Sequence, residues 1–483
     1  MAHDDSTSMY RRIVKATGLL GGVQIFSILC SIVRNKCIAL WLGASGVGII
    51  SLYYTTIEMI ASLTGLGLRQ SAVRDIAQAH AAGDEREVRT TIAVVRRWNW
   101  LAGMLGAVVL LSLAPLLSRF TFGDEEHLWA YTCLSCSLLL NALTSSDQAV
   151  LQGLNRLRAF SSASLAGNVV ALALSIPLYY FYRFDAIVPS LILSYAAALL
   201  FTFLYRRKVV SGRVTLSARE TWHRGKTMLI LGIYMTVSGF LTTLFNYLLV
   251  NFIHRVGGDA ELGYYQSGYA IVTRYVGLVL TAMATEYYPR LAAVGDDAGR
   301  LRQQVSRQSE VALLLLTPII TLFFLFQDWV VRLLYAAEFL CIDVYFSWAM
   351  VGVLFKAVSW AMGFILIAKG DGRLFLITEL VSGLLGLVLT AAGYYWGGLE
   401  GAGVAYLLDF LLYALMMWII CRRRYGLRYG RSWYKVFAGA VAGCSAVSWL
   451  CRLSSPAAWA GAVACALLAS VWALWLLKRR LFR

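Results

Sequence analysis

Long apolar stretches, separated by short polar or basic connections, follow one another along almost the whole chain. Each is close to the roughly 20 residues that a helix needs to cross the hydrocarbon core of a bilayer. The pattern predicts fourteen membrane-spanning helices, near residues 16–33, 47–68, 98–118, 128–146, 160–182, 186–205, 227–250, 262–284, 311–334, 344–367, 374–396, 401–420, 436–451 and 457–477. Because backbone polar groups must be satisfied inside a membrane, we expect an all-α, polytopic fold.

The second predicted span, with the turn before it, recurs later in the chain. Residues Gly43–Ala77 align without a gap on Gly258–Ala292. A second match, Gln152–Leu157 with Lys369–Leu374, has nearly the same spacing along the chain, longer by two positions. Both repeats begin on the same side of the membrane, so the matches predict two parallel repeats of six helices.

The repeats define the predicted domain organisation. We expect an N-terminal lobe over residues 1–205, a basic cytoplasmic linker over 206–226, a C-terminal lobe over 227–424 and an added helix hairpin over 425–483. Two similar bundles with polar groups between them are typical of transporters that work by alternating access.

The composition agrees with a membrane protein. The chain is 59% hydrophobic and 14% charged, whereas soluble proteins are about 45–50% apolar and about 25% charged. The net charge of +17 does not indicate a nucleic-acid partner, because the basic residues lie in short connections between apolar spans. With the N-terminus in the cytoplasm, 34 of the 43 Lys and Arg residues lie in cytoplasmic segments and seven lie outside. The positive-inside rule therefore predicts that both termini are cytoplasmic.

Ionisable residues within the predicted spans are candidates for the functional site, since charge inside a membrane is costly. Glu58 in the second span and Arg274 in the eighth are the leading pair, and we expect them to line a cavity that binds an anion. The alternative is an internal ion pair that locks two helices together. Arg34, at the end of the first span, suits phosphate recognition, because its planar fork donates hydrogen bonds in pairs. Snorkelling to the interface is the alternative for Arg34.

Four further residues complete the candidate site. Lys356 lies deep within the tenth span and is expected to line the cavity, and Glu286 ends the eighth span. For Glu286 the simpler interpretation is a solvated helix end. Glu379 and Asp409 lie in adjacent spans, and their carboxylate oxygens could bind a coupling ion, either H⁺ or Na⁺. Hydrogen bonding to neighbouring helices is the alternative for this acidic pair.

Enzyme motifs are absent from the sequence. Gly225-Lys226-Thr227 resembles the end of a phosphate-binding loop, but Glu220 occupies the position that requires glycine. The chain has no HExxH and no GxSxG motif. We therefore expect a protein that is not an enzyme and that needs no cofactor other than a coupling ion.

Several short motifs resemble those of polysaccharide exporters of the multidrug/oligosaccharidyl-lipid/polysaccharide superfamily, and most of all the O-antigen translocases. These motifs are Lys15–Gln24, Arg34-Asn-Lys36, Leu42-Gly43 with Gly46-Val-Gly48, Gly65-Leu-Gly67 with Val73-Arg74, and the inner turns Gly153–Arg156 and Gly370–Arg373. The resemblance covers essentially the whole chain.

The resemblance implies a V-shaped pair of six-helix lobes around a central cavity lined by spans 1, 2, 7 and 8. It also implies a substrate, an undecaprenyl-pyrophosphate-linked oligosaccharide such as an O-antigen repeat unit, flipped across a bacterial inner membrane. Membrane lipids, a polysaccharide polymerase and a chain-length regulator are the implied partners. Related flippases have a cation site between spans 7, 11 and 12, where Glu379 and Asp409 would lie.

Three rival functions stay open at this point. A cation-coupled multidrug exporter of the same superfamily would favour acidic residues in its cavity, whereas Arg34, Arg274 and Lys356 are cationic. A membrane polysaccharide polymerase would carry a large outer loop, but the predicted outer loops are short. A scaffold in an assembly complex would tolerate the loss of the cavity charges.

Overall fold

The computed structural model describes residues 2–210, 216–275, 277–294, 297–453 and 455–481, so residues 211–215 of the predicted linker lie outside it. Every regular element in these ranges is a helix, which confirms the predicted all-α polytopic fold. The elements are α1 (Ala2–Trp41), α2 (Gly43–Thr64), α3 (Leu68–Ala81), α4 (Glu85–Thr121), α5 (Leu128–Gly153), α6 (Leu157–Tyr182), η1 (Arg183–Ala186), α7 (Ile187–Val209), α8 (Ala218–Ala270), η2 (Ile271–Tyr275), α9 (Gly277–Ala292), α10 (Ala298–Leu334), η3 (Ala337–Ile342), α11 (Asp343–Ala368), α12 (Gly372–Tyr425), α13 (Arg431–Arg452) and α14 (Pro456–Leu481).

Eleven helical stretches of the described residues are long and apolar enough to cross a membrane. Three of them contain 53, 50 and 54 residues, namely Leu157–Val209, Gly239–Tyr288 and Gly372–Tyr425. Each is more than twice the length of roughly 20 residues that one crossing needs. Each is also interrupted by non-helical backbone, at Arg183, Gly258 and Gly397–Gly398, respectively. These breaks accommodate fourteen crossings, although that number itself stays a prediction.

Turns with left-handed backbone recur between the two halves of the chain. Three pairs of positive-φ residues share one and the same spacing along the sequence: Gly43 (68°) and Gly258 (80°), Asn155 (54°) and Gly370 (72°), and Arg183 (50°) and Gly398 (56°). Positive φ is uncommon for residues other than glycine. The same spacing at three turns therefore supports two repeats with the same order of helices.

The inner turns correct one detail of the sequence alignment. The amide of Asn155 donates to the carbonyl of Gln152 over 2.9 Å, and the amide of Gly370 donates to that of Ile367 over 3.1 Å. The amide of Arg156 donates to the carbonyl of Leu151, and in the same way the amide of Asp371 donates to the carbonyl of Leu366. Equivalent positions of the two inner turns are therefore separated by the same number of residues as Gly43 and Gly258. The difference of two positions arises when identical residues, and not equivalent turn positions, are aligned.

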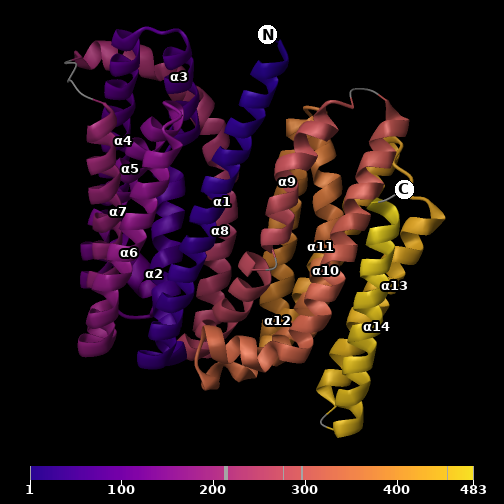
Figure 1. The fold of residues 1–483 in the computed structure, drawn as a ribbon. Coiled ribbons are helices and arrows are strands. Elements are labelled where there is room, and N and C mark those ends of the chain that lie inside the picture. Colours follow the sequence, from indigo (N-terminus) through magenta and orange to yellow (C-terminus); the bar gives the residue numbers. More distant parts are fainter. Residues whose placement is uncertain (1, 211–215, 276, 295–296, 454, 482–483) are drawn as a thin grey trace. The chain divides into compact units, whose positions relative to one another are not determined.

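The chain divides into two compact units, residues 1–251 and 252–483, which are described separately. In the first unit α4 packs along α5, α6 packs along α7, and α1 packs against α6 (Figure 1). The short helix α3 packs against α4 and α5, and it buries Leu68, Ala72 and Ile76 on one face. The predicted lobe boundaries at 205 and 227 stay a prediction, since the division between the units lies within α8.

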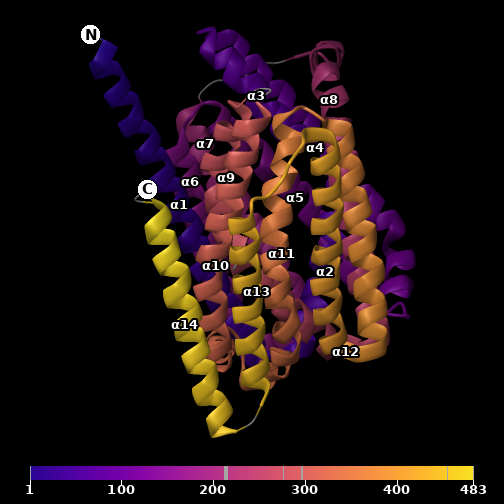
Figure 2. The same ribbon diagram turned by 90° about the vertical axis from the view of Figure 1, so that its right-hand side faces the viewer.

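In the second unit α11 packs along α12, and the hairpin of α13 and α14 packs against α10 (Figure 2). The Nε1 atom of Trp433 donates to Ser309 Oγ over 2.8 Å, and Ser448 Oγ donates to the carbonyl of Ser347 over 2.8 Å. Because these bonds are buried, the hairpin is held to the unit by specific polar contacts as well as by apolar packing.

The turn between α11 and α12 gives a prediction about pH. Asp371 accepts hydrogen bonds from Arg424 (2.8 Å) and from the hydroxyl of Tyr425, and these bonds hold the pKa of its carboxyl below the ordinary value of 3.8. A lowered pKa stabilises the folded state above the ordinary pKa, and this stabilisation is lost as the pH falls through the folded-state value. Asp371→Asn should therefore melt at a lower temperature than the parent at neutral pH, and the difference should shrink as the pH falls below about 3.8 and vanish once the pH lies below the lowered pKa. Thermal unfolding in detergent measures this, and a difference that stays constant with pH would contradict it.

Candidate functional site

The first unit brings two of the predicted residues, Arg34 and Glu58, around one tyrosine. Glu58 projects from α2 as an exposed residue between the buried side chains of Ile57 and Met59. Arg34 lies on α1 and is half-buried. Tyr195 of α7 is within electrostatic reach of both charges. Charges of opposite sign from two helices therefore share one polar region of the first unit, and their predicted role in lining a cavity stays a prediction.

A second aromatic ring extends this region. Tyr54 precedes Glu58 by one helical turn, and its ring stacks on Tyr195 with centroids 6.4 Å apart. Arg34 is also within electrostatic reach of Tyr179 on α6. Tyrosine combines an apolar ring with a polar hydroxyl, so these residues suit a surface that meets both a polar head group and apolar chains.

The second unit places Arg274 in a π-helical turn, η2. Single π-helical turns within α-helices occur frequently at functional sites. Ile271 and Val272 of this turn are buried, whereas Arg274 is exposed. Tyr269, just over one helical turn earlier, is within electrostatic reach of both Arg274 and Asp409. The structure thus connects two residues that the sequence analysis assigned to different roles.

Lys356 and Asp409 lie close together on α11 and α12. Lys356 Nζ donates a hydrogen bond to the hydroxyl of Tyr406 over 3.4 Å, and it lies 4.9 Å from the centroid of the Phe410 ring. Asp409 and Lys356 interact electrostatically but make no direct ion pair among the described residues. The Oδ1 atom of Asp409 is buried without a hydrogen-bond partner in the described part of the chain. A buried polar atom of this kind requires an explanation, because it has lost its hydration without compensation.

The remaining predicted acids have partners of different kinds. Glu379 is exposed and accepts a hydrogen bond from Tyr413 over 2.8 Å. Tyr413 is also within electrostatic reach of Asp409, so one tyrosine joins the two candidate coupling-ion residues. Glu286 lies 3.6 Å from Arg290 on the same helix and is largely exposed. The structure therefore connects Glu379 with the Lys356–Asp409 group, whereas Glu286 pairs along its own helix. The roles proposed for all three acids stay predictions.

The tyrosines of this group were not predicted as site residues. Tyr406 and Tyr413 lie three residues before and four residues after Asp409, and this spacing places all three side chains on one face of a helix. That spacing was a signal available in the sequence. Tyr269 carried no such signal, because it approaches Asp409 from a distant helix.

The first unit also contains a buried ion pair. Asp147 of α5 is 2% exposed, and its Oδ1 atom lies 2.7 Å from Nε of Arg206 on α7, which is 7% exposed. Arg96 of α4 lies 3.7 Å from the same oxygen. Three helices therefore meet at one carboxylate, and the pair is part of the internal packing of the unit.

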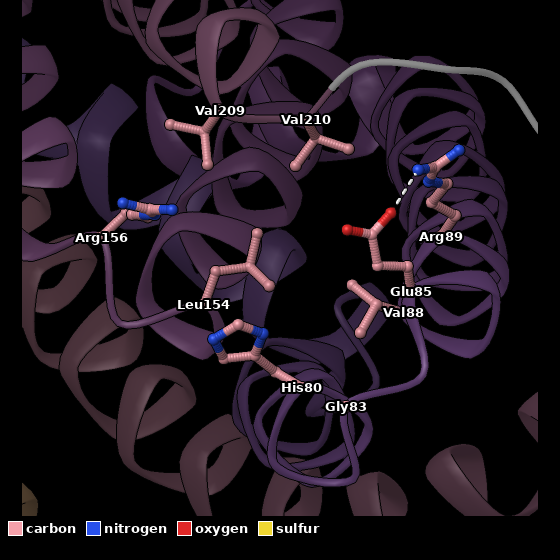
Figure 3. Close-up of a pocket in the computed structure, with 9 residues that line it drawn as sticks. All are labelled: His80, Gly83, Glu85, Val88, Arg89, Leu154, Arg156, Val209 and Val210. Atoms are coloured by element: carbon pink, nitrogen blue, oxygen red, sulfur yellow. Dashed lines mark hydrogen bonds and ion pairs between the residues drawn. The ribbon is translucent and has the colours of Figure 1, made fainter.

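A hollow of about 410 Å³ lies among helix ends of the first unit. Figure 3 shows His80, Arg156 and the ion-paired Glu85 and Arg89 around its opening, with the side chains of Leu154, Val88, Val209 and Val210 also lining it. The residues that line this hollow do not include those of the predicted site. It is formed by α3, α4, the turn after α5 and the end of α7.

Comparisons with known proteins agree with this architecture. The Lipid III flippase of Escherichia coli (strain K12) is 21% identical over 430 residues, which cover 85% of this chain and 99% of that protein. A structure of the lipid II flippase MurJ in an inward closed conformation matches with a TM-score of 0.71 at 12% identity, over 97% of this chain and 100% of that one. An inward-facing MATE family transporter of the MOP superfamily matches with a TM-score of 0.70 at 14% identity, over 85% and 96% of the two chains.

The structural matches show a common fold, and the family assignment comes from the sequence. The model of the family described as "Polysaccharide biosynthesis protein" matches residues 38–343, which is more than half of the chain. The resemblance to polysaccharide exporters that the short motifs predict is thereby confirmed at the level of the family. This multi-pass membrane protein belongs to the polysaccharide biosynthesis protein family.

Proposed function

We propose that this chain is a flippase for a lipid-linked oligosaccharide. The observation that carries the proposal is the match to the Lipid III flippase over 99% of that protein's length. The cationic residues Arg34, Arg274 and Lys356 support it, since an anionic head group needs such partners in a low-dielectric environment. In this role the chain moves its substrate without making or breaking a covalent bond, so it is not an enzyme.

The substrate we propose is an undecaprenyl-pyrophosphate-linked repeat unit, of the O-antigen or a similar polysaccharide. A pyrophosphate cannot cross hydrocarbon unaided, because its charges would lose their hydration. Guanidinium groups replace that hydration with paired, charge-assisted hydrogen bonds, while the polyprenyl tail stays in lipid. A polysaccharide polymerase and a chain-length regulator are the protein partners that such a step requires downstream.

We place the protein in a bacterial inner membrane with both termini in the cytoplasm. The excess of Lys and Arg in the connections on that side supports this orientation. A membrane potential that is negative inside favours outward movement of an anion by about 2.3 kcal/mol per charge per 100 mV. We also propose that an ion, H⁺ or Na⁺, is coupled to the transport cycle.

Deletion of the chain in its host, followed by analysis of the lipids in each leaflet, tests the proposal. We expect undecaprenyl-linked oligosaccharide to accumulate facing the cytoplasm, with surface polysaccharide lost and restored by the intact chain. Single repeat units that reach the outer leaflet without polymerising would indicate a polymerase. Unchanged polysaccharide together with new drug sensitivity would indicate a multidrug exporter.

A further inference from the structure

The buried oxygen of Asp409 and the nearby ammonium of Lys356 form an arrangement that can exist in two charge states. We propose that Asp409 and Lys356 are a proton switch in the second unit, in which protonation of Asp409 releases the Lys356 ammonium to an anionic ligand. The identity of that ligand as a pyrophosphate rests on the proposed function. The switch itself depends only on contacts within the second unit.

The contacts of Lys356 match the protonated state of Asp409. An ionised carboxylate beside an ammonium in a medium of low dielectric would draw it into direct contact. Instead the ammonium lies over the rings of Phe410 (4.9 Å) and Tyr406 (5.9 Å), where cation–π attraction holds it. A neutral carboxylic acid tolerates the buried, unpartnered oxygen better than a carboxylate does, since burial of an uncompensated charge is far more costly.

Loss of the proton leads to the second state. The O–H bond of the Asp409 carboxyl breaks, the proton passes to water, and the electron pair stays on the carboxylate. The flexible side chain of Lys356 can then turn from the aromatic rings to the carboxylate and form the ion pair. The net charge of the two residues falls from +1 to zero, so the deprotonated state withdraws one cation from any bound anion.

Other groups around Asp409 define which residue titrates. Among the described residues, one lysine and four tyrosines are within electrostatic reach of Asp409: Lys356 from α11, Tyr265 and Tyr269 from α8, and Tyr406 and Tyr413 from α12. Two further charged residues are connected to Asp409 indirectly, Glu379 through Tyr413 and Arg274 through Tyr269. In model peptides tyrosine is neutral and lysine and arginine are charged near neutral pH, whereas a carboxyl group that burial deprives of water can take up a proton there. The two carboxyl groups are therefore the candidates for a proton, and Glu379 differs from Asp409 because it is exposed and hydrogen-bonded.

The switch is connected to Arg274 through Tyr269, which is within reach of both Arg274 and Asp409. An anion that binds near these cations favours the state in which Lys356 is available. By linkage, binding of the anion must then favour protonation of Asp409 to the same extent. The expected consequence is that anion binding takes up a proton and weakens as the pH rises.

The test uses the purified full-length protein in detergent, with farnesyl pyrophosphate as the probe. Titration calorimetry in two buffers with different ionisation enthalpies measures the protons taken up on binding. For the parent chain we expect net proton uptake and an affinity that falls by up to about tenfold per pH unit. Asp409→Asn should bind the probe with little pH dependence and no uptake. Lys356→Met should bind weakly at every pH, and the surface control Asp297→Asn should keep the uptake of the parent. Glu379→Gln tests whether the other carboxyl group of this region takes up the proton.

Each contrary result has one meaning. Equal proton uptake by the parent and Asp409→Asn overturns the switch while leaving the proposed function intact, and loss of uptake in Glu379→Gln assigns the proton to that residue instead. If Asp409→Asn does not fold, the double variant Lys356→Met/Asp409→Asn replaces it, with no uptake expected.

If the parent does not bind the probe at any pH, the pyrophosphate ligand class is overturned. Infrared difference spectra between acid and alkaline buffer then decide the switch alone: a carboxylic-acid band that Asp409→Asn lacks supports it, and an unchanged band overturns it.

Discussion

Replacement of Arg274 by alanine should lower the translocation of lipid-linked oligosaccharide by about 10- to 100-fold without lowering the amount of protein in the membrane. Hydrogen bonds to charged groups contribute about 1.5–3 kcal/mol each, which corresponds to that range of rates. Arg274 is exposed in a π-helical turn whose neighbours Ile271 and Val272 are buried. Its removal therefore leaves the packing of the turn in place, and the loss should fall on ligand binding.

The measurement is the ratio of lipid-linked oligosaccharide in the two leaflets, together with surface polysaccharide and immunodetection of the protein. Arg274→Lys should retain part of the activity, because it keeps the charge but loses the planar fork. Arg300→Ala is the matched control, since Arg300 is 77% exposed and pairs with Asp297 at the start of α10. Normal polysaccharide in Arg274→Ala would remove this residue from the mechanism.

Asp147→Ala should cause the largest loss of stability, about 3–5 kcal/mol, because it leaves the Arg206 guanidinium buried without its counter-ion. Arg206 is 7% exposed, and its Nε atom lies 2.7 Å from the carboxylate. Arg96, the second cation near Asp147, would add repulsion once the carboxylate is gone. We expect less protein in the membrane and a lower unfolding temperature in detergent.

Two further variants test whether the loss of stability comes from breaking the buried ion pair or from substitution in general. The double variant Asp147→Leu/Arg206→Met should recover much of the lost stability, since a buried pair replaced by apolar residues of similar size is often tolerated. Glu85→Ala removes a surface partner of Arg89 that is 84% exposed, and it should cost at most about 1 kcal/mol. A similar loss in Glu85→Ala and Asp147→Ala would contradict the importance of burial.

The charged groups of the two units differ in a way that suits their expected roles. Asp147 and Arg206 are buried in direct contact and belong to the permanent packing of the first unit. Lys356 and Asp409 are within electrostatic reach without direct contact, so a small movement of one flexible side chain can change their interaction. The first pair stabilises a single structure, whereas the second can occupy two states.

The apolar pattern was sufficient to predict the helical fold, and the alignment of two stretches of the chain predicted the internal repeat. A bilayer imposes a length and a hydropathy on each crossing, and both can be counted along a single segment. A glycine-containing turn before the second span was also predicted, because a tight turn between apolar runs favours glycine. The structure adds that Gly43 and Gly258 have positive φ. The amphipathic helix α3 was not predicted separately, since its apolar face is too short to register among longer spans.

Which charges meet was decided by the tertiary structure alone. Asp147 lies far from Arg206 in the sequence, and Lys356 lies far from Asp409, so no local spacing could pair them. The sequence by itself determined that these ionisable groups lie within or at the ends of apolar spans, where each needs a partner. Helix packing alone determined that Asp147 has a direct counter-ion, whereas Asp409 lies near Lys356, whose ammonium is held over aromatic rings. The reason is that side-chain contacts depend on the rotation and register of neighbouring helices.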